Sequence, residues 1–162
     1  MMHPSRILSA ALMALAVLAA LALPAMAGDA GWDAGLTVTS GRASNSLSLG
    51  RQPDATIAHD GRYDVPALLG GTLRAWFSLG EGQQYWRDVR STADADGWLL
   101  IVESDSPAPV TLTWDASAFA GFARAVMIDD QAHVSIPLAE DSSYTFTPAD
   151  DAPRSFRIFA RK

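Results

Sequence analysis

The chain offers few residue types from which a catalytic centre could be built. It contains no cysteine, which excludes a thiol nucleophile and a cysteine-bound metal. Beyond the N-terminal segment only His59 and His133 could act as general bases, and no Gly-x-Ser-x-Gly pattern of a nucleophilic serine occurs. The glutamates lie at predicted turns or strand ends and nominate no carboxylate pair for glycoside hydrolysis. The sequence therefore predicts a protein that is not an enzyme.

Three aspartates, Asp54, Asp60 and Asp64, lie within the stretch 51–71, which is predicted to be a long and mostly irregular connection. Carboxylates at this spacing could gather around Ca²⁺, although the pattern does not match an EF-hand loop. Aspartates in loops also stabilise turns, because their side chains bond to the backbone two residues further on. The sequence leaves both interpretations open, and it predicts no cofactor other than this calcium ion.

Aromatic residues supply the candidate binding surface. Apolar residues alternate over 72–79 and again over 85–89, and Gly80-Glu81-Gly82 between them predicts a hairpin with a three-residue loop. In that register Trp76 lies opposite Trp86 on the outer face of the sheet. Two exposed tryptophans can stack on sugar rings or pack against another protein. Alternatively, the long connection before the hairpin folds over both rings and buries them.

The same register places charged residues beside the two tryptophans. Arg74 is expected opposite Asp88, and Thr72 opposite Arg90, so that a pair of opposite charges adjoins the aromatic pair. Arg87 then points to the inner face, where its side chain has to lie at the margin of the sheet. The candidate binding surface comprises Arg74, Trp76, Trp86, Asp88 and Arg90.

A long series of predicted strands positions these residues. From Leu36 to Ala160 apolar residues recur at every second position, with turn residues between the runs. This spacing predicts an all-β fold, an antiparallel β-sandwich of about 8–10 strands. Trp98 and Trp114 are expected to be core residues. The strand around Leu99 is apolar on both faces, so something is expected to cover its second face.

Several short stretches together resemble the immunoglobulin-like or fibronectin-III-like accessory domains of bacterial secreted proteins. The stretches are Leu47–Gly50, Asp60–Asp64, Trp86–Arg90, Val110–Trp114, Tyr144–Phe146 and Arg154–Ile158. The resemblance implies an immunoglobulin-like β-sandwich that serves as a spacer, a binding module or a site of assembly. Such domains usually sit beside a catalytic or anchoring domain, whereas this chain has one predicted domain. That difference favours self-assembly or a separate partner.

The N-terminal segment has the pattern of a secretory signal peptide. Arg6 precedes the apolar run 7–23, and Ala25-Met26-Ala27 suits signal peptidase, so residues 1–27 are predicted to be removed. An uncleaved membrane anchor is the alternative. Residues 28–162 then form a single domain in the periplasm or outside the cell. No later apolar run is long enough for the mature chain to insert stably into a membrane.

Composition narrows the partners of this exported domain. The formal net charge of −6 at pH 7 argues against nucleic acid as a partner. Without cysteine the fold has no disulfides, although its compartment would permit them. The sequence thus predicts a non-enzymatic, exported β-sandwich module that binds another secreted protein or itself. The alternative is a carbohydrate-binding or adhesin-like domain in which Trp76 and Trp86 stack on a polysaccharide.

Overall fold

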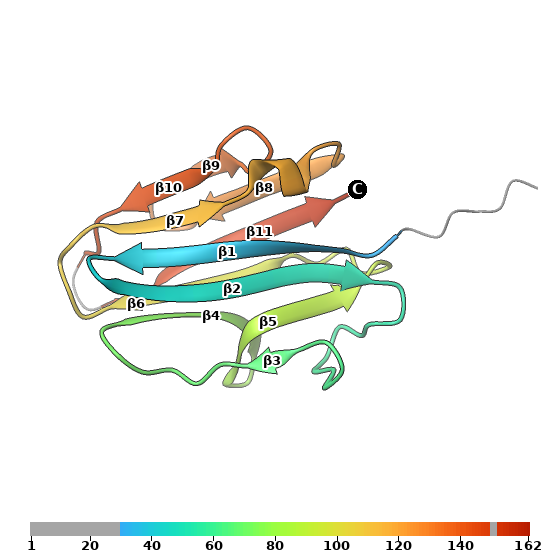
Figure 1. Cartoon of the computed structure of the whole chain (residues 1–162), viewed down its shortest axis with the longest axis horizontal. Coiled ribbons are helices and arrows are strands. Elements are labelled where there is room, and N and C mark those ends of the chain that lie inside the picture. Colours follow the sequence, from blue (N-terminus) through green and yellow to red (C-terminus); the bar gives the residue numbers. More distant parts are fainter. Residues whose placement is uncertain (1–29, 150–151) are drawn as a thin grey trace, which may run out of the picture.

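The computed structural model describes residues 30–149 and 152–162 (Figure 1). The predicted signal peptide, residues 1–27, lies outside the described residues. The described chain is built of β-strands with one short 3₁₀ helix, η1 (Ala116–Phe119), which confirms the all-β prediction. None of the described residues form a helix with the length and apolar character needed to cross a bilayer.

All strands join one hydrogen-bonded sheet. They are β1 (Trp32–Ser40), β2 (Ala43–Gln52), β3 (Val65–Pro66), β4 (Leu73–Gly80), β5 (Gln83–Ser91), β6 (Trp98–Ser104), β7 (Val110–Trp114), β8 (Arg124–Asp129), β9 (Val134–Pro137), β10 (Ser143–Phe146) and β11 (Arg154–Arg161). Their order is β10-β7-β1-β2-β5-β4-β6-β11-β8-β9, and β3 pairs with β5. Every pair is antiparallel except β2 with β5, which run parallel.

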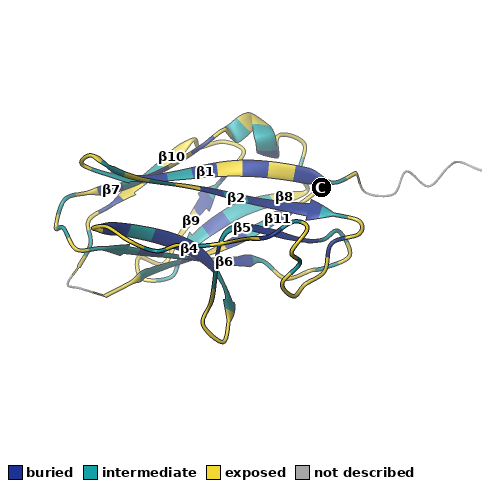
Figure 2. Cartoon of the chain, turned by 60° about the horizontal axis from the view of Figure 1, so that its bottom comes forward, coloured by how far each residue is buried: buried dark blue, intermediate teal, exposed yellow. Residues whose placement is uncertain are grey.

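The sheet curls into a shape that is nearly a barrel, so that β1, β2, β7 and β10 lie over the other strands (Figure 2). The two edge strands, β9 and β10, follow each other in the chain and are joined by a turn. The sequence predicted about 8–10 strands and antiparallel pairing throughout; both details differ from the observed eleven strands and the parallel pair. The connection 53–72 accounts for the parallel pair, because it carries the chain across before β4 and lets β5 return along β2.

The core fills the space between the two layers. Along β1 the alternation of buried and exposed positions places Trp32, Leu36 and Val38 inward. The Trp32 ring meets Trp98 of β6 edge to face, with 5.7 Å between ring centres. Trp98 is 1% exposed, and Trp114 is also buried, which confirms that both are core residues.

The β4–β5 hairpin keeps the predicted register only near its turn. Ser78 lies opposite Gln84 and Phe77 opposite Tyr85, as predicted, but a register shift next to the loop places Gly80, not Leu79, opposite Gln83. The loop itself has three successive residues with left-handed backbone, and two of them are glycines, which adopt that conformation without strain. Beyond Tyr85 the two strands separate, because β5 turns to pair with β2 while β4 stays paired with β6. This separation decides where the candidate surface residues lie.

Candidate functional site

The predicted ladder of Trp76 with Trp86 and Arg74 with Asp88 is not formed. Trp76 is only 7% exposed, and Trp86 is partly buried. Arg74 instead binds Glu103 in β6 and Asp105 just after that strand. Its Nε lies 2.9 Å from Glu103 Oε2, and its Nη2 lies 2.7 Å from Asp105 Oδ1. The prediction fails because β5 leaves β4 before these positions are reached. A platform of two exposed rings for sugar stacking is therefore absent from this hairpin.

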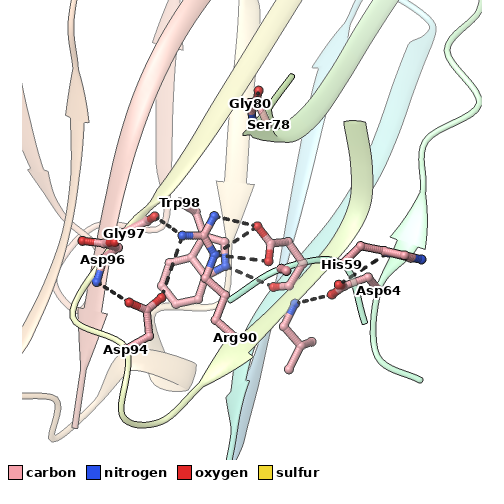
Figure 3. A network of polar contacts seen from close by, with 12 residues as sticks. His59, Asp64, Ser78, Gly80, Arg90, Asp94, Asp96, Gly97 and Trp98 are labelled. Atoms are coloured by element: carbon pink, nitrogen blue, oxygen red, sulfur yellow. Dashed lines mark hydrogen bonds and ion pairs between the residues drawn. The ribbon is translucent and has the colours of Figure 1, made fainter. Parts of the chain in front are cut away.

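Asp88 and Arg90 were expected on the outer face opposite β4, and both are buried instead. They are 1% and 7% exposed, and Arg90 Nη2 donates to Asp88 Oδ2 at 2.9 Å (Figure 3). Arg90 Nη1 donates to the Gly97 carbonyl at 2.7 Å. The indole N–H of Trp98 donates to the Asp88 carbonyl at 3.1 Å. These bonds tie β5 to the start of β6.

Asp94, in the loop between β5 and β6, extends this buried network of charges. Its Oδ2 lies 4.0 Å from Arg90 Nη1 and 3.8 Å from Arg51 Nη1, while its Oδ1 accepts from the Asp96 backbone N–H at 2.9 Å (Figure 3). Arg51 also donates to the Ser91 and Asp96 carbonyls, at 2.8 and 2.7 Å. Acids and guanidinium groups thus alternate along the network, which offsets part of the cost of burying these charges, although Asp94 Oδ2 and Arg51 Nε have no hydrogen-bond partner among the described residues.

Burial changes the acid–base properties of two members of this network. It raises the pKa of the Asp88 carboxyl, against the opposing effect of the hydrogen bonds from Arg90. It also lowers the pKa of the Arg51 guanidinium, although Asp94 acts in the opposite direction. Arg51 and Arg90 both lie against the Trp98 ring, with their Cζ atoms 4.8 and 5.6 Å from its centre. Arg90 and Asp94 of this network form the floor of a surface depression.

The three aspartates of the predicted calcium site point to separate donors. Asp54 accepts from the side chains of Arg62 and Tyr63. The buried Asp64 accepts from two backbone N–H groups, of Asp60 at 2.7 Å and of Val89 at 2.9 Å. Asp60 accepts from a backbone N–H two residues on, as the turn interpretation expects. Within residues 30–149 and 152–162 no three His, Asp or Glu side chains are grouped so as to hold a metal ion.

The two histidines lie apart from each other. His59 stacks on Tyr85, with 5.4 Å between ring centres. Its Nδ1 lies 3.8 Å from Asp64 Oδ2 (Figure 3). His133 is an exposed turn residue with a φ of 55°. His59 therefore lies in the connection 53–72 and His133 in the turn between β8 and β9.

An apolar depression lies above the buried network, on the outer side of β4 and β6. Its volume is about 410 Å³. Its lining residues are Ile57, Ser78, Leu79, Gly80, Arg90, Asp94, Asp96, Gly97 and Leu99. We call this cavity the apolar depression; Ile57, Leu79 and Leu99 form its apolar wall, and Arg90, Asp94 and Asp96 supply its charged lining.

Two of the exposed apolar side chains of the described residues, Ile57 and Leu99, line the apolar depression. Large hydrophobic residues with substantial exposure are Ile57 (63%), Val65 (46%), Leu68 (80%), Leu99 (36%) and Val134 (41%). The first three belong to the connection 53–72, and Leu99 lines the depression with Ile57. The alternation in β6 predicted the outward position of Leu99, but nothing in the sequence placed it beside Ile57, which lies 42 residues earlier by their numbers.

Comparisons with protein-family models, with curated proteins and with solved structures give no match for this chain. The function must therefore be inferred from the geometry of the surface itself.

Proposed function

We propose that this protein is a non-enzymatic, exported module that binds another protein, a second copy of itself included, through the apolar depression. The observation that carries the proposal is the wall formed by Ile57, Leu79 and Leu99. Ile57 and Leu99 are exposed, while Leu79 is partly buried against the core. Exposed apolar side chains around a concave surface are typical of protein-binding sites.

The charged lining determines where the polar groups of a partner can bind. Arg90 is fixed by Asp88 and Gly97, so its position does not depend on a partner. A partner side chain that is aliphatic or aromatic fits the wall, while a polar group at its margin can reach Asp96, which is exposed. Because the floor is already ordered, binding costs little conformational entropy on this side of the interface.

The immunoglobulin-like character of the domain belongs to the same proposal. What supports it is the two layers of strands around one core and the resemblance of the strand sequences. Such modules bind partners by sheet faces and by the loops between strands, and the apolar depression combines a β4–β6 face with the connection 53–72.

The variant Leu99→Glu tests the proposal, with Val134→Glu as its matched control. Both side chains are similarly exposed, at 36% and 41%, but Val134 lies on β9, outside the depression. We expect Leu99→Glu to weaken association by about tenfold or more, as loss of a buried apolar contact of about 1.4 kcal/mol implies. Light scattering across a concentration series measures self-association, and co-purification with exported proteins measures other partners.

The control separates a specific surface from general stickiness. Val134→Glu is expected to leave association unchanged, and circular dichroism should show both variants folded. A wild-type chain that stays monomeric and retains no exported protein contradicts the proposal. So does an equal loss in the two variants.

A further inference from the structure

A second cavity, on the other side of the β5–β6 loop, is lined by three arginines. Its volume is about 270 Å³, and we call it the basic cleft. Its lining residues are Arg51, Asp94, Ala95, Asp96, Arg124, Phe159, Ala160 and Arg161. A smaller cavity shares Arg51, Asp94 and Arg161 with it and adds Lys162.

Two arginines of the basic cleft lie directly opposite each other. Arg124 of β8 is the cross-strand partner of Arg161 of β11. Like charges in this arrangement destabilise a sheet, because their side chains lie close together on one face. Both side chains are exposed, and neither makes an ion pair with any acid among residues 30–149 and 152–162. The repulsion between them is therefore not relieved within the part of the chain that the structure describes.

Most other described arginines differ from this pair. Seven described arginines form ion pairs, whereas Arg42, Arg124, Arg161 and Lys162 do not. Three of these four cations line the basic cleft or the small cavity beside it. The positive charge at this end of an acidic protein is thus concentrated around one concave surface.

A third arginine reaches the cleft from inside the barrel. Arg51 is 5% exposed, and its Nε is buried without a hydrogen-bond partner among the described residues. Its two Nη groups are already bound to the Ser91 and Asp96 carbonyls. Arg51 therefore adds its positive charge to the cleft, while its hydrogen-bonding groups stay inside the fold.

Aromatic rings hold the exposed cations in place. The Arg124 guanidinium carbon lies 4.6 Å from the centre of the Phe159 ring, and Lys162 Nζ lies 5.6 Å from that of Phe122. Phe159 in turn packs over Gly97, since a Cβ on that glycine would come within 2.8 Å of the ring. Arg124 and Lys162 are therefore positioned before any ligand arrives.

The two acids of the basic cleft do not cancel its charge. Asp94 is shared between Arg51 and Arg90, at 3.8 and 4.0 Å, so it neutralises charge inside the buried network. Asp96 is the remaining acid of the lining, against Arg124 and Arg161. The open part of the cleft keeps a positive excess.

From this arrangement we infer that the basic cleft binds a phosphate group, either as the free anion or as the monoester of a small molecule. Arg124 of β8 and Arg161 of β11 line the cleft with free guanidinium donors, and the buried Arg51 of β2 adds a third positive charge, which suits an anion with several acceptor oxygens. A bound phosphate would relieve the repulsion between Arg124 and Arg161.

The test compares wild type with Arg124→Gln and Arg161→Gln in a low-salt buffer. Arg42→Gln is the matched control, because Arg42 is another exposed arginine without an ion pair among the described residues and lies in the β1–β2 turn. Calorimetric titration with inorganic phosphate should show binding to wild type and to the control. Each of the other two variants should bind at least about tenfold more weakly, since each loses charge-assisted hydrogen bonds.

Thermal unfolding gives a second readout, because phosphate should reverse the sign of the difference in melting temperature between wild type and variant. Without phosphate, Arg161→Gln should raise the melting temperature, because it removes the like-charge pair. With phosphate in excess, wild type should gain stability and overtake the variant. Sodium chloride at equal ionic strength should not reproduce this reversal.

The source of the phosphate is distinguished by repeating the titration with a hexose monophosphate. Tighter binding of the ester identifies a small-molecule phosphate as the ligand, and equal binding identifies the free anion. Absence of binding by both probes at millimolar concentration overturns the inference. Equal weakening in Arg42→Gln and Arg161→Gln overturns it too.

Discussion

Replacing Asp129 with asparagine is expected to destabilise the domain strongly without touching either surface cavity. Asp129 is fully buried at the end of β8. Its Oδ1 accepts from the backbone N–H groups of Gln131 and Ala132, at 3.0 and 2.9 Å. Its Oδ2 accepts from Tyr144 Oη at 2.9 Å and from Arg154 Nη2 at 2.6 Å. One carboxylate thus links β8 to β10 and β11, across the gap between the edges of the sheet.

The size of the effect follows from what asparagine changes. Its amide can still accept at Oδ1, but its NH₂ group then points at the guanidinium of Arg154. The Arg154 side chain is 17% exposed, so it would lose its only ion pair within the described chain while largely buried. Removing one partner of such a pair costs about 3 kcal/mol, which corresponds to a fall of about 10 °C in melting temperature for a domain of this size.

The dependence on pH gives the sign of the electrostatic contribution. Burial alone would raise the pKa of Asp129, but the bonds from Arg154, Ala132 and Tyr144 outweigh it and lower the pKa below its ordinary value. A carboxyl whose pKa is depressed by folding stabilises the protein above its unfolded pKa, and this stabilisation is lost as pH falls through the folded pKa. The difference between wild type and Asp129→Asn should therefore shrink below about pH 4.

Urea denaturation at several pH values measures this difference, and Asp130→Asn is the matched control. Asp130 binds Arg157 at 2.8 Å, but the Arg157 side chain is 54% exposed. Loss of such a pair should cost less than about 1 kcal/mol. If the two variants lose the same free energy of unfolding at pH 7, the reasoning about Asp129 is refuted.

Two further substitutions test the packing. Gly97→Ala should lower the free energy of unfolding by about 2 kcal/mol, because the new Cβ would lie 2.3 Å from the Ile158 carbonyl oxygen and 2.8 Å from the Phe159 ring. Gly35→Ala is the control, because there is open space around its Cβ. Equal melting temperatures for the two variants would contradict this prediction. Trp76→Ala should lower the free energy of unfolding by about 3 kcal/mol, because the ring is buried; a loss below 1 kcal/mol by urea titration would show that the ring packs little.

The inward and outward alternation of the strands could be predicted from sequence because it is a local property. Leu36 and Val38 point to the core as the period of two requires, and Trp98 does so in β6. The β4–β5 register was also predictable as far as Phe77 and Tyr85, since a tight turn fixes the pairing next to it.

The fate of the hairpin beyond Tyr85 was not predictable in the same way. It depends on β2, whose Leu49 pairs with Asp88 in a parallel ladder formed across a connection that has no repeating pattern. When β2 is left out of account, the hairpin register predicts that the charged side chains of Asp88 and Arg90 point outward. Inside the fold they become a buried pair, because Asp94 and Arg51 arrive from other segments to continue the network.

The candidate sites show the same division between local and long-range information. The two-sided apolar pattern of its strand predicted that Leu99 points outward, but it also predicted a cover for that face, whereas the side chain is 36% exposed. Its neighbour Ile57 is placed by the fold of the connection 53–72. Arg124 and Arg161 carried no motif, and only the pairing of β8 with β11 brings them together.

The most direct test of the apolar depression as a docking surface is site-specific photocrosslinking in the exporting cell. A photoreactive residue is placed at position 99, and separately at position 134 as the control. We expect discrete crosslinked species from position 99, to a partner or to a second copy, and none of these from position 134. No crosslink from position 99, or the same pattern from both positions, would contradict a protein-binding role for this surface.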